Sequence, residues 1–296
     1  MLSQSATLAL PNQPAAQREI DDLIYLYAIL PAGALVPLPM MCMDHDRPLY
    51  LLENENFRVV VSRVRPQAFE QAALSINLQD AAWLEAHVRL HQHVLDYVVA
   101  TEKAVLPLRF CTLYRNEAAV QSMLARYQAE LAGQLERLAG KQEWGVKLFV
   151  QPAALQAAIL ANHAALNAWG GNDEVAQLQA QIATLSRGAA FLFQKKLDVA
   201  LANKVDTLAF ALADHSHLQL AGWAAEAVSN PLRQQQPEMC LNAAYLVANA
   251  NLTAFRRTLD VLSETYRAAG LYYELSGPWP PYNFLQLDLT DKGERR

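Results

Sequence analysis

The sequence has no concentration of basic charge and no long apolar run. Its 24 lysine and arginine residues are scattered among 29 acidic residues, which leaves a net charge of −5. Nucleic-acid binders carry clustered cations that neutralise phosphates, so we expect no nucleic-acid partner. The longest uncharged stretch, Met239–Phe255, is interrupted by three asparagines, and no apolar run reaches the ~18 residues of a membrane span. We therefore expect no membrane partner either.

Cysteine is scarce, with only Cys42, Cys111 and Cys240 in the chain. An odd number at wide spacing does not fit a secreted disulfide framework and favours reduced thiols in a cytosol. The first residues, MLSQSATLALPNQPAAQ, place no basic residue before their short apolar patch, whereas a signal peptide would. We expect a soluble, cytoplasmic protein.

The motifs of common catalytic sites are missing as well. The sequence contains no GxGxxG, GxxxxGK[ST], GxSxG or HExxH. Their absence weakens nucleotide-binding and hydrolase functions without excluding them, because a site can be assembled from distant residues. We expect a protein that is not an enzyme, with no catalytic residue, cofactor or metal.

Three short clusters carry side chains that could do chemistry. His87 and His91 have the one-turn spacing of two metal ligands on a helix, but no third ligand lies nearby in the sequence, and core or boundary histidines are the favoured interpretation. Cys42–His45 offers a thiol, a carboxylate and an imidazole without a second matching pair, so a plain loop is favoured over a zinc site. Asp214–His217 contains the residue types of a catalytic triad, yet chain neighbours rarely reach that geometry. We expect it to close a helix.

What the chain does have is apolar content for two cores. Hydrophobic residues make up 53% of its 296 residues, and a domain usually takes ~100–200 residues. The expected divisions are a flexible arm at 1–19, a first domain at 20–140, a second domain at 141–277 and a C-terminal tail at 278–296.

Hydrophobic periodicity predicts strands and helices in the first domain. Leu84, Val88, Leu95 and Val98 recur at the spacing of one helix face. The expected elements are a strand at Leu23–Leu30, a hairpin at residues 49–64 around the turn NEN, a helix from an Asp80 cap to about Glu102, a strand at Ala104–Phe110, and a helix from an Asn116 cap to a stop at Gly140 with Val120, Met123, Tyr127, Leu131 and Leu138 on one face.

The second domain shows a different order of elements. A helical pattern starts near Asp173 and continues as far as Ala213, with a break near Gly188 or Asn203, or a projection from the body, as alternatives. The expected elements are a strand at Glu143–Val150, a short alanine-rich helix, the long helix, strands at Leu218–Val228 and Met239–Asn249, a helix from Leu252 to a stop at Gly270, and a strand at Leu271–Leu275.

This order defines the expected fold class. Strand, helix, strand, strand, helix, strand is the ferredoxin-like βαββαβ order. The second domain therefore is predicted to be ferredoxin-like with a long helical insertion. The first is predicted to be a modified ferredoxin-like domain in which the first helix is missing or is replaced by a proline-rich loop. The whole chain is predicted to be an α+β protein with antiparallel sheets and helices on one face of each.

Three charged residues stand out within predicted strands. Arg109 lies among apolar residues in VLPLRF, and a partly buried arginine usually finds a carboxylate or carbonyls. A structural ion pair is favoured there, with contact to a partner as the alternative. Glu143 and Lys147 share one face of a strand, and we expect a solvated pair.

Residues 276–284 read SGPWPPYNF, with three prolines and three aromatic rings. Proline is excluded from helix interiors and central strands because it lacks the N–H group. The rings of Trp279, Tyr282 and Phe284 are too apolar for an idle tail. The run either packs back over the protein or forms part of a protein-binding surface, where rigid aromatics are favoured.

Several of these stretches resemble one family. LIYLYAIL, HQHVLDYVV before AVLPLRFCTLY, EWGVKLFV, CLNAAYLVANANLTAF and ELSGPWPPYNF are similar, in this order, to gas vesicle proteins of the GvpF/GvpL family. The resemblance runs from about residue 22 to residue 285. Cys111 departs from the pattern, because the family commonly has glycine after RF, and this argues against a tight backbone turn there.

The resemblance implies an α+β accessory protein that helps to build gas vesicles. It implies binding to the small, hydrophobic shell protein GvpA and to other gas vesicle accessory proteins, a location at the gas vesicle as well as in the cytoplasm, and no catalytic residue or cofactor. The alternative is a ferredoxin-like ligand-sensing module without catalytic activity. We expect the partner-binding residues on the VLPLRF strand and in the tail, at Arg109, Phe110, Trp279, Pro281, Tyr282 and Phe284.

Overall fold

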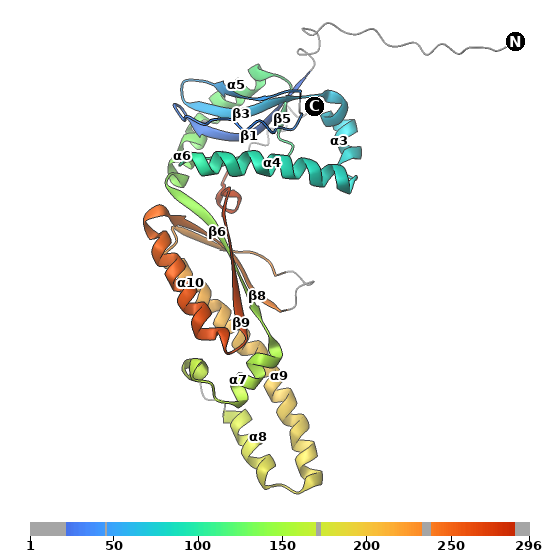
Figure 1. Ribbon diagram of the computed structural model, residues 1–296, viewed down its shortest axis with the longest axis vertical. Coiled ribbons are helices and arrows are strands. Elements are labelled where there is room, and N and C mark those ends of the chain that lie inside the picture. The colour runs from blue at the N-terminus through green and yellow to red at the C-terminus, as the bar shows by residue number, and fades with distance from the viewer. Residues whose placement is uncertain (1–21, 45, 170–172, 233–237, 288–296) are drawn as a thin grey trace, which may run out of the picture. The chain divides into compact units, whose positions relative to one another are not determined.

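The protein is an α+β molecule with two antiparallel sheets, each in its own compact unit (Figure 1). The computed structural model describes residues 22–44, 46–169, 173–232 and 238–287. Of these described residues, those up to 139 and residues 286–287 belong to the first unit, and those from 140 to 285 belong to the second. The expected arm at 1–19 lies outside the described residues.

The sheet of the first unit has β1 at its centre, because this strand is apolar along its whole length. Every residue from Ile24 to Leu30 is fully buried, which confirms the predicted strand, and β2 and β3 form the predicted hairpin. The strand order is β2-β3-β1-β4, and β5 also pairs with β1. The strands are β1 (Leu23–Pro31), β2 (Leu49–Glu53), β3 (Phe57–Val64), β4 (Leu106–Pro107) and β5 (Leu113–Tyr114).

Side-chain caps start two helices of the first unit, as predicted. The Asp80 carboxylate accepts hydrogen bonds from the backbone N–H groups of Ala82 and Trp83, and the Asn116 side chain accepts one from Ala119. Such caps satisfy N–H groups that have no partner within the helix. The helices are α2 (Pro66–Phe69), α3 (Gln71–Asn77), α4 (Ala81–Thr101), α5 (Glu117–Arg126) and α6 (Gln128–Leu138).

Two predictions for the helices of this unit were wrong in detail. Val88 is 41% exposed, because the side of α4 that packs on β1 carries His91, Leu95 and Val98 instead. The helix from Asn116 is divided into α5 and α6 at Tyr127, whose φ of −103° and ψ of 21° leave the helical region. The apolar spacing did not reveal this break, because buried residues continue on both sides of it.

The sheet of the second unit has the order β7-β8-β6-β9, with every neighbouring pair antiparallel. Alternate residues of β6, namely Trp144, Val146, Leu148 and Val150, enter the core. The residues between them point to what we call the outer face, opposite the helices. The strands are β6 (Lys141–Val150), β7 (Glu226–Ser229), β8 (Met239–Ala248) and β9 (Leu271–Trp279).

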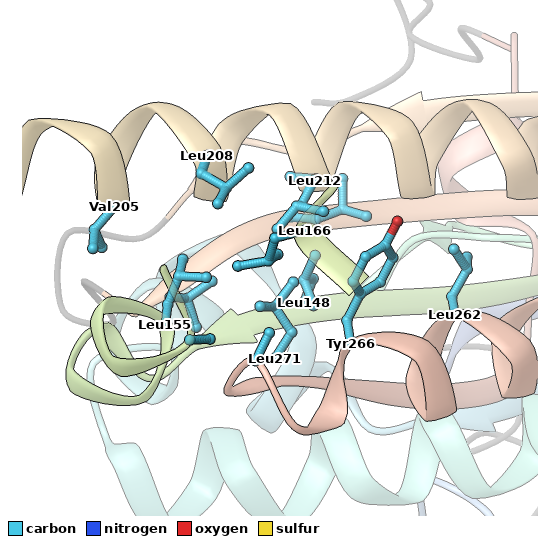
Figure 2. Packing of buried hydrophobic residues seen from close by; sticks show 14 of the residues in the cluster. Leu148, Leu155, Leu166, Val205, Leu208, Leu212, Leu262, Tyr266 and Leu271 are labelled. Atoms are coloured by element: carbon cyan, nitrogen blue, oxygen red, sulfur yellow. The ribbon is translucent and has the colours of Figure 1, made fainter. Parts of the chain in front are cut away.

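Helices α9 and α10 cover the inner face of this sheet, and α8 lies alongside α9 (Figure 1). Leu148 from β6, Leu208 and Leu212 from α9, and Tyr266 from α10 meet in one apolar cluster (Figure 2). The sequence of elements is strand, helices, strand, strand, helix, strand. The helices are α7 (Pro152–Leu160), η1 (Ala164–Trp169), α8 (Asp173–Thr184), α9 (Arg187–Ala221), η2 (Asn249–Asn251), α10 (Leu252–Arg267) and η3 (Tyr282–Phe284).

The predicted strand from Leu218 was partly wrong. Helix α9 continues through Ala221 because Leu212, Ser216 and Leu220 place buried side chains at four-residue intervals, which is helical spacing. Only Glu226–Ser229 is a strand. Asp214–His217 therefore lies inside the helix and does not close it. The long helical pattern breaks between Thr184 and Arg187, just before Gly188.

The last strand is longer than predicted. We expected it to end at Leu275, but β9 continues through Pro278 to Trp279. This is possible because β9 is an edge strand, where the missing N–H of a proline removes no bond from the sheet.

None of the helices in the described ranges combines the length and the apolar content that a membrane span requires.

Candidate partner-binding surface at strand β9

The end of β9 is shaped by a glycine that lies against the neighbouring strand. Gly277 has a φ of +121°, and a Cβ atom there would lie 2.9 Å from the carbonyl oxygen of Glu143. Only glycine fits both the backbone angle and the space. The pairing of β6 with β9 shifts register at this point, between Glu143 and Gly145. The shift sets the position of Trp279.

The Trp279 side chain lies beside Gly145 on the outer face of the sheet. Its indole Nε1–H donates to the Ser276 hydroxyl at 3.0 Å. A Cβ atom on Gly145 would lie 2.8 Å from the Ser276 Oγ and 3.7 Å from the Trp279 Nε1, so glycine leaves the room that both side chains occupy. The indole is held in place, yet it remains 42% exposed. A rigid, exposed aromatic side chain is suited to contact another protein.

Glu143 holds the segment that follows Trp279. Its carboxylate is 3% exposed and accepts hydrogen bonds from the Asn283 backbone N–H at 3.1 Å and from the Asn283 Nδ2 at 2.6 Å. Burial raises the pKa of Glu143, and the two bonds from Asn283 partly oppose this rise. The predicted solvated pair with Lys147 was wrong, because the tail segment covers Glu143.

The tail residues differ in how far they are accessible. Pro281 is buried, Phe284 is 2% exposed and Tyr282 is half-buried. Trp279 is therefore the predicted tail residue that presents a large apolar surface. Further along β9, Tyr272 is 38% exposed and stacks on Phe149 of β6 with ring centroids 4.9 Å apart.

The other two predicted partner-binding residues belong to the first unit. Arg109 is exposed rather than partly buried, and Phe110 is half-buried, with its ring 5.8 Å from that of His91. The predicted strand around them shrinks to the two residues of β4, and residues 104–108 are buried. Helix α6 packs against β4 and against its neighbour β1.

Cys111 adopts the left-handed conformation that favours glycine, with a φ of 61°. The carbonyl of Arg109 accepts from the backbone N–H of Thr112 at 3.1 Å, so a tight turn is present here despite the cysteine. The Cys111 N–H donates to the Tyr25 hydroxyl at 3.0 Å. The sequence argument against a turn at this position was wrong.

The histidines serve the fold. His91 is 3% exposed, and its Nδ1 and Nε2 contact the Tyr25 hydroxyl and the Leu108 carbonyl oxygen. Burial lowers the pKa of His91 to about 4. His87 stacks on Trp83 with ring centroids 3.8 Å apart. In the ranges that the structure describes, no group of three or more potential metal ligands comes together.

The two remaining clusters also have structural surroundings. The Cys42 thiol donates to the carbonyl oxygens of Asp44 and Arg47, burial raises its pKa, and His45 lies outside the described residues. Within Asp214–His217, the Ser216 hydroxyl contacts the Leu212 carbonyl oxygen and the Tyr273 hydroxyl. The His217 Nδ1 contacts the Tyr245 hydroxyl at 2.9 Å. None of these arrangements pairs a nucleophile with an oriented base.

The sequence did not predict that Glu143, Gly145, Ser276 and Asn283 position Trp279 and the segment after it. The strand alternation puts Glu143 and Gly145 on the face opposite the core, but no local pattern indicates that a segment far along the chain covers this face. The proline–aromatic run was the one available signal in the sequence, and Trp279, Ser276 and Asn283 lie within it.

Fold and site together define an α+β protein with two antiparallel sheets and exposed aromatic side chains along strand β9. The chain belongs to the gas vesicle synthesis protein GvpL/GvpF family, whose model matches residues 23–286. Proteins of this family take part in gas vesicle formation and are structural and assembly proteins rather than known enzymes. The chain accordingly has a role in gas vesicle formation.

Individual relatives cover nearly the whole chain. Gas vesicle protein L of Streptomyces sp. (strain CB03234) is 30% identical over 281 residues, which is 93% of this chain and 97% of that protein. Gas vesicle protein F of Dolichospermum flosaquae is 23% identical over 270 residues, which is 90% and 98% of the two chains. The crystal structure of GvpF from Anabaena sp. PCC7120 has a TM-score of 0.63 at 20% identity and covers 90% of this chain and 99% of that one. This structure supports the fold.

Proposed function

We propose that the protein is a non-enzymatic assembly factor that binds the shell protein GvpA, or other gas vesicle accessory proteins, while vesicles form. It would act in the cytoplasm and at the vesicle. The observation that carries the proposal is the Trp279 indole, which is fixed by Ser276 and Gly145 and yet is 42% exposed. Burying a large apolar side chain is worth about 1.5–3 kcal/mol, so this ring can contribute much of the affinity of a small interface.

We further propose that the partner adds a strand to the edge at β9. Among the described residues, β9 pairs only with β6, and its Tyr272 and Leu275 are each 38% exposed. A free edge offers backbone hydrogen bonds to an extended segment, and the side chains beside it select the sequence. A hydrophobic shell subunit has edges that aggregate unless they are covered, so an adaptor of this kind would keep it available for assembly.

The strand orders support a ferredoxin-like description of the units. The sheet has the order β7-β8-β6-β9, and along the chain helices follow β6 and β8. This arrangement agrees with the βαββαβ motif. We propose that the second unit is ferredoxin-like with α8 and α9 as an insertion, and that the first is a modified version. In this description β9 is an edge of the motif and is accessible to a partner.

Capture of GvpA by the purified chain tests the proposal. Trp279→Ala should reduce capture by about tenfold, because about 1.4 kcal/mol corresponds to a factor of ten. Trp223→Ala is a matched control: that indole is 41% exposed and donates to the Thr258 hydroxyl, but it lies away from β9. Equal capture by the wild type and a folded Trp279→Ala protein would remove β9 from the interface.

A further inference from the structure

Helix α9 carries an apolar stripe on its exposed side. Leu192 and Val199 are each 62% exposed and Phe210 is 58% exposed. They are separated by about two and about three helical turns, so they lie on one face. The opposite side of the helix carries Val205, which points into the core together with its neighbours (Figure 2). The stripe is therefore additional to the residues that fix the helix to its unit.

The charge beside this stripe changes sign along the helix. Within about 60° of the stripe around the helix, the first part carries the exposed cations Lys195 and Lys196, and the later part carries the exposed anions Asp206 and Asp214.

The neighbouring helix does not account for this order of charges. After Glu174, α8 contains no charged residue, so it offers no carboxylates to the basic part of α9. The Lys195 ammonium instead lies 5.1 Å from the centre of the Phe191 ring, which is 62% exposed. Cation and ring together form a surface that suits an apolar partner carrying carboxylates.

We infer that this face pairs with the same face of a second copy of the chain, with the two α9 helices antiparallel. Centring the pair on residues 199–203 puts Leu192 of each copy opposite Phe210 of the other. The same register puts Lys196 of each copy opposite Asp206 of the other. Each contact occurs twice, as a two-fold interface requires.

A second copy of the chain complements both the basic half and the acidic half of this face, whereas the other possible partners complement only one half. An acidic helix from another protein, or an anionic lipid surface, would suit the basic half but would be repelled by Asp206 and Asp214. The stripe from Leu192 to Phe210 spans about 27 Å. Such a contact is at the small end of specific interfaces, so the pairing is weak and depends on concentration.

Charge reversal on the exposed side tests this pairing, because these substitutions leave the core untouched. Lys195→Glu/Lys196→Glu makes the face acidic throughout, and Asp206→Lys/Asp214→Lys makes it basic throughout. Each variant alone should associate at least about tenfold more weakly than the wild type, and an equimolar mixture of the two should associate at least as well as the wild type. Lys103→Glu/Arg257→Glu, at exposed positions elsewhere, gives the control for net charge.

Sedimentation equilibrium over a concentration series measures the association. We expect the wild type and the control to dimerise and Phe210→Ser to weaken the dimer. A wild type that stays monomeric up to about 1 mM, where even weak affinities become visible, overturns the inference. So does a dimer that all the charge variants retain. The result is independent of GvpA capture through Trp279, because the stripe and β9 are changed by different substitutions.

Discussion

The Tyr25 hydroxyl lies 2.9 Å from the Nδ1 of His91, between the central strand and the long helix of the first unit. The Leu108 carbonyl can only accept, so the His91 Nε2 carries the proton and Nδ1 accepts from the tyrosine. The Tyr25 oxygen in turn accepts from the Cys111 N–H. One hydroxyl thus joins β1, α4 and the turn at Cys111.

Replacing Tyr25 by phenylalanine removes these bonds and keeps the ring. We expect the free energy of unfolding of the first unit to fall by about 1–3 kcal/mol, since buried polar groups lose their partner. Urea denaturation measures the change. Tyr97→Phe, at a half-buried tyrosine of α4, is the control and should stay within about 0.5 kcal/mol. Equal stability of the two variants would show that the Tyr25 hydroxyl is not needed.

His91 should make the first unit sensitive to acid. Its pKa is about 4 in the folded protein and about 6.5 in the unfolded chain. The unfolded state therefore binds the proton first, and stability is lost as the pH falls from about 6.5 to about 4, by roughly 2–4 kcal/mol. His91→Gln can donate to Leu108 and accept from Tyr25 without titrating. As the pH falls over this range, the wild type should lose unfolding free energy relative to His91→Gln. A difference between the two proteins that does not change with pH would contradict the lowered pKa of His91.

The sequence predicted those parts of the fold that depend on neighbours in the chain. The caps at Asp80 and Asn116 and the strand at Leu23–Leu30 are local signals, and all three are confirmed. The apolar stretch after Leu218 was misassigned because short apolar runs suit either a helix or a strand. The burial of Glu143 could not be predicted, since it depends on Asn283, far along the chain.

The buried carboxylate of Glu143 should give the second unit the opposite dependence on pH. Burial raises its pKa in the folded state above the value of about 4.3 in the unfolded chain. The folded protein therefore keeps this proton up to a higher pH than the unfolded chain does. The contribution of Glu143 to the free energy of unfolding is fully present below about pH 4.3 and is lost as the pH rises through the raised pKa. Glu143→Gln removes this loss.

Urea denaturation at several pH values compares the two proteins. The stability of Glu143→Gln relative to wild type should rise between about pH 4.3 and neutrality. Glu143→Ala should be less stable than either by about 1–3 kcal/mol, because Asn283 then loses its acceptor. A pH-independent difference between wild type and Glu143→Gln would show that this carboxyl has an ordinary pKa.

Gly145 should be the residue of β6 where adding a methyl group disturbs the candidate surface. The new Cβ would lie 2.8 Å from the Ser276 Oγ, so the hydroxyl has to move and the Trp279 N–H loses its acceptor. We expect Gly145→Ala to destabilise the second unit by about 1–3 kcal/mol and to change the fluorescence emission of Trp279. The emission of Trp279 is obtained by subtracting the spectrum of a Trp279→Phe protein, once with glycine and once with alanine at position 145. Gly133→Ala in α6, where nothing lies within 4 Å of the added Cβ, should instead stabilise the first unit by about 0.5–1 kcal/mol. We also expect Gly145→Ala to reduce the capture of GvpA. If the variant leaves both stability and emission unchanged, the position of the indole does not depend on this glycine, and capture should then be unchanged as well.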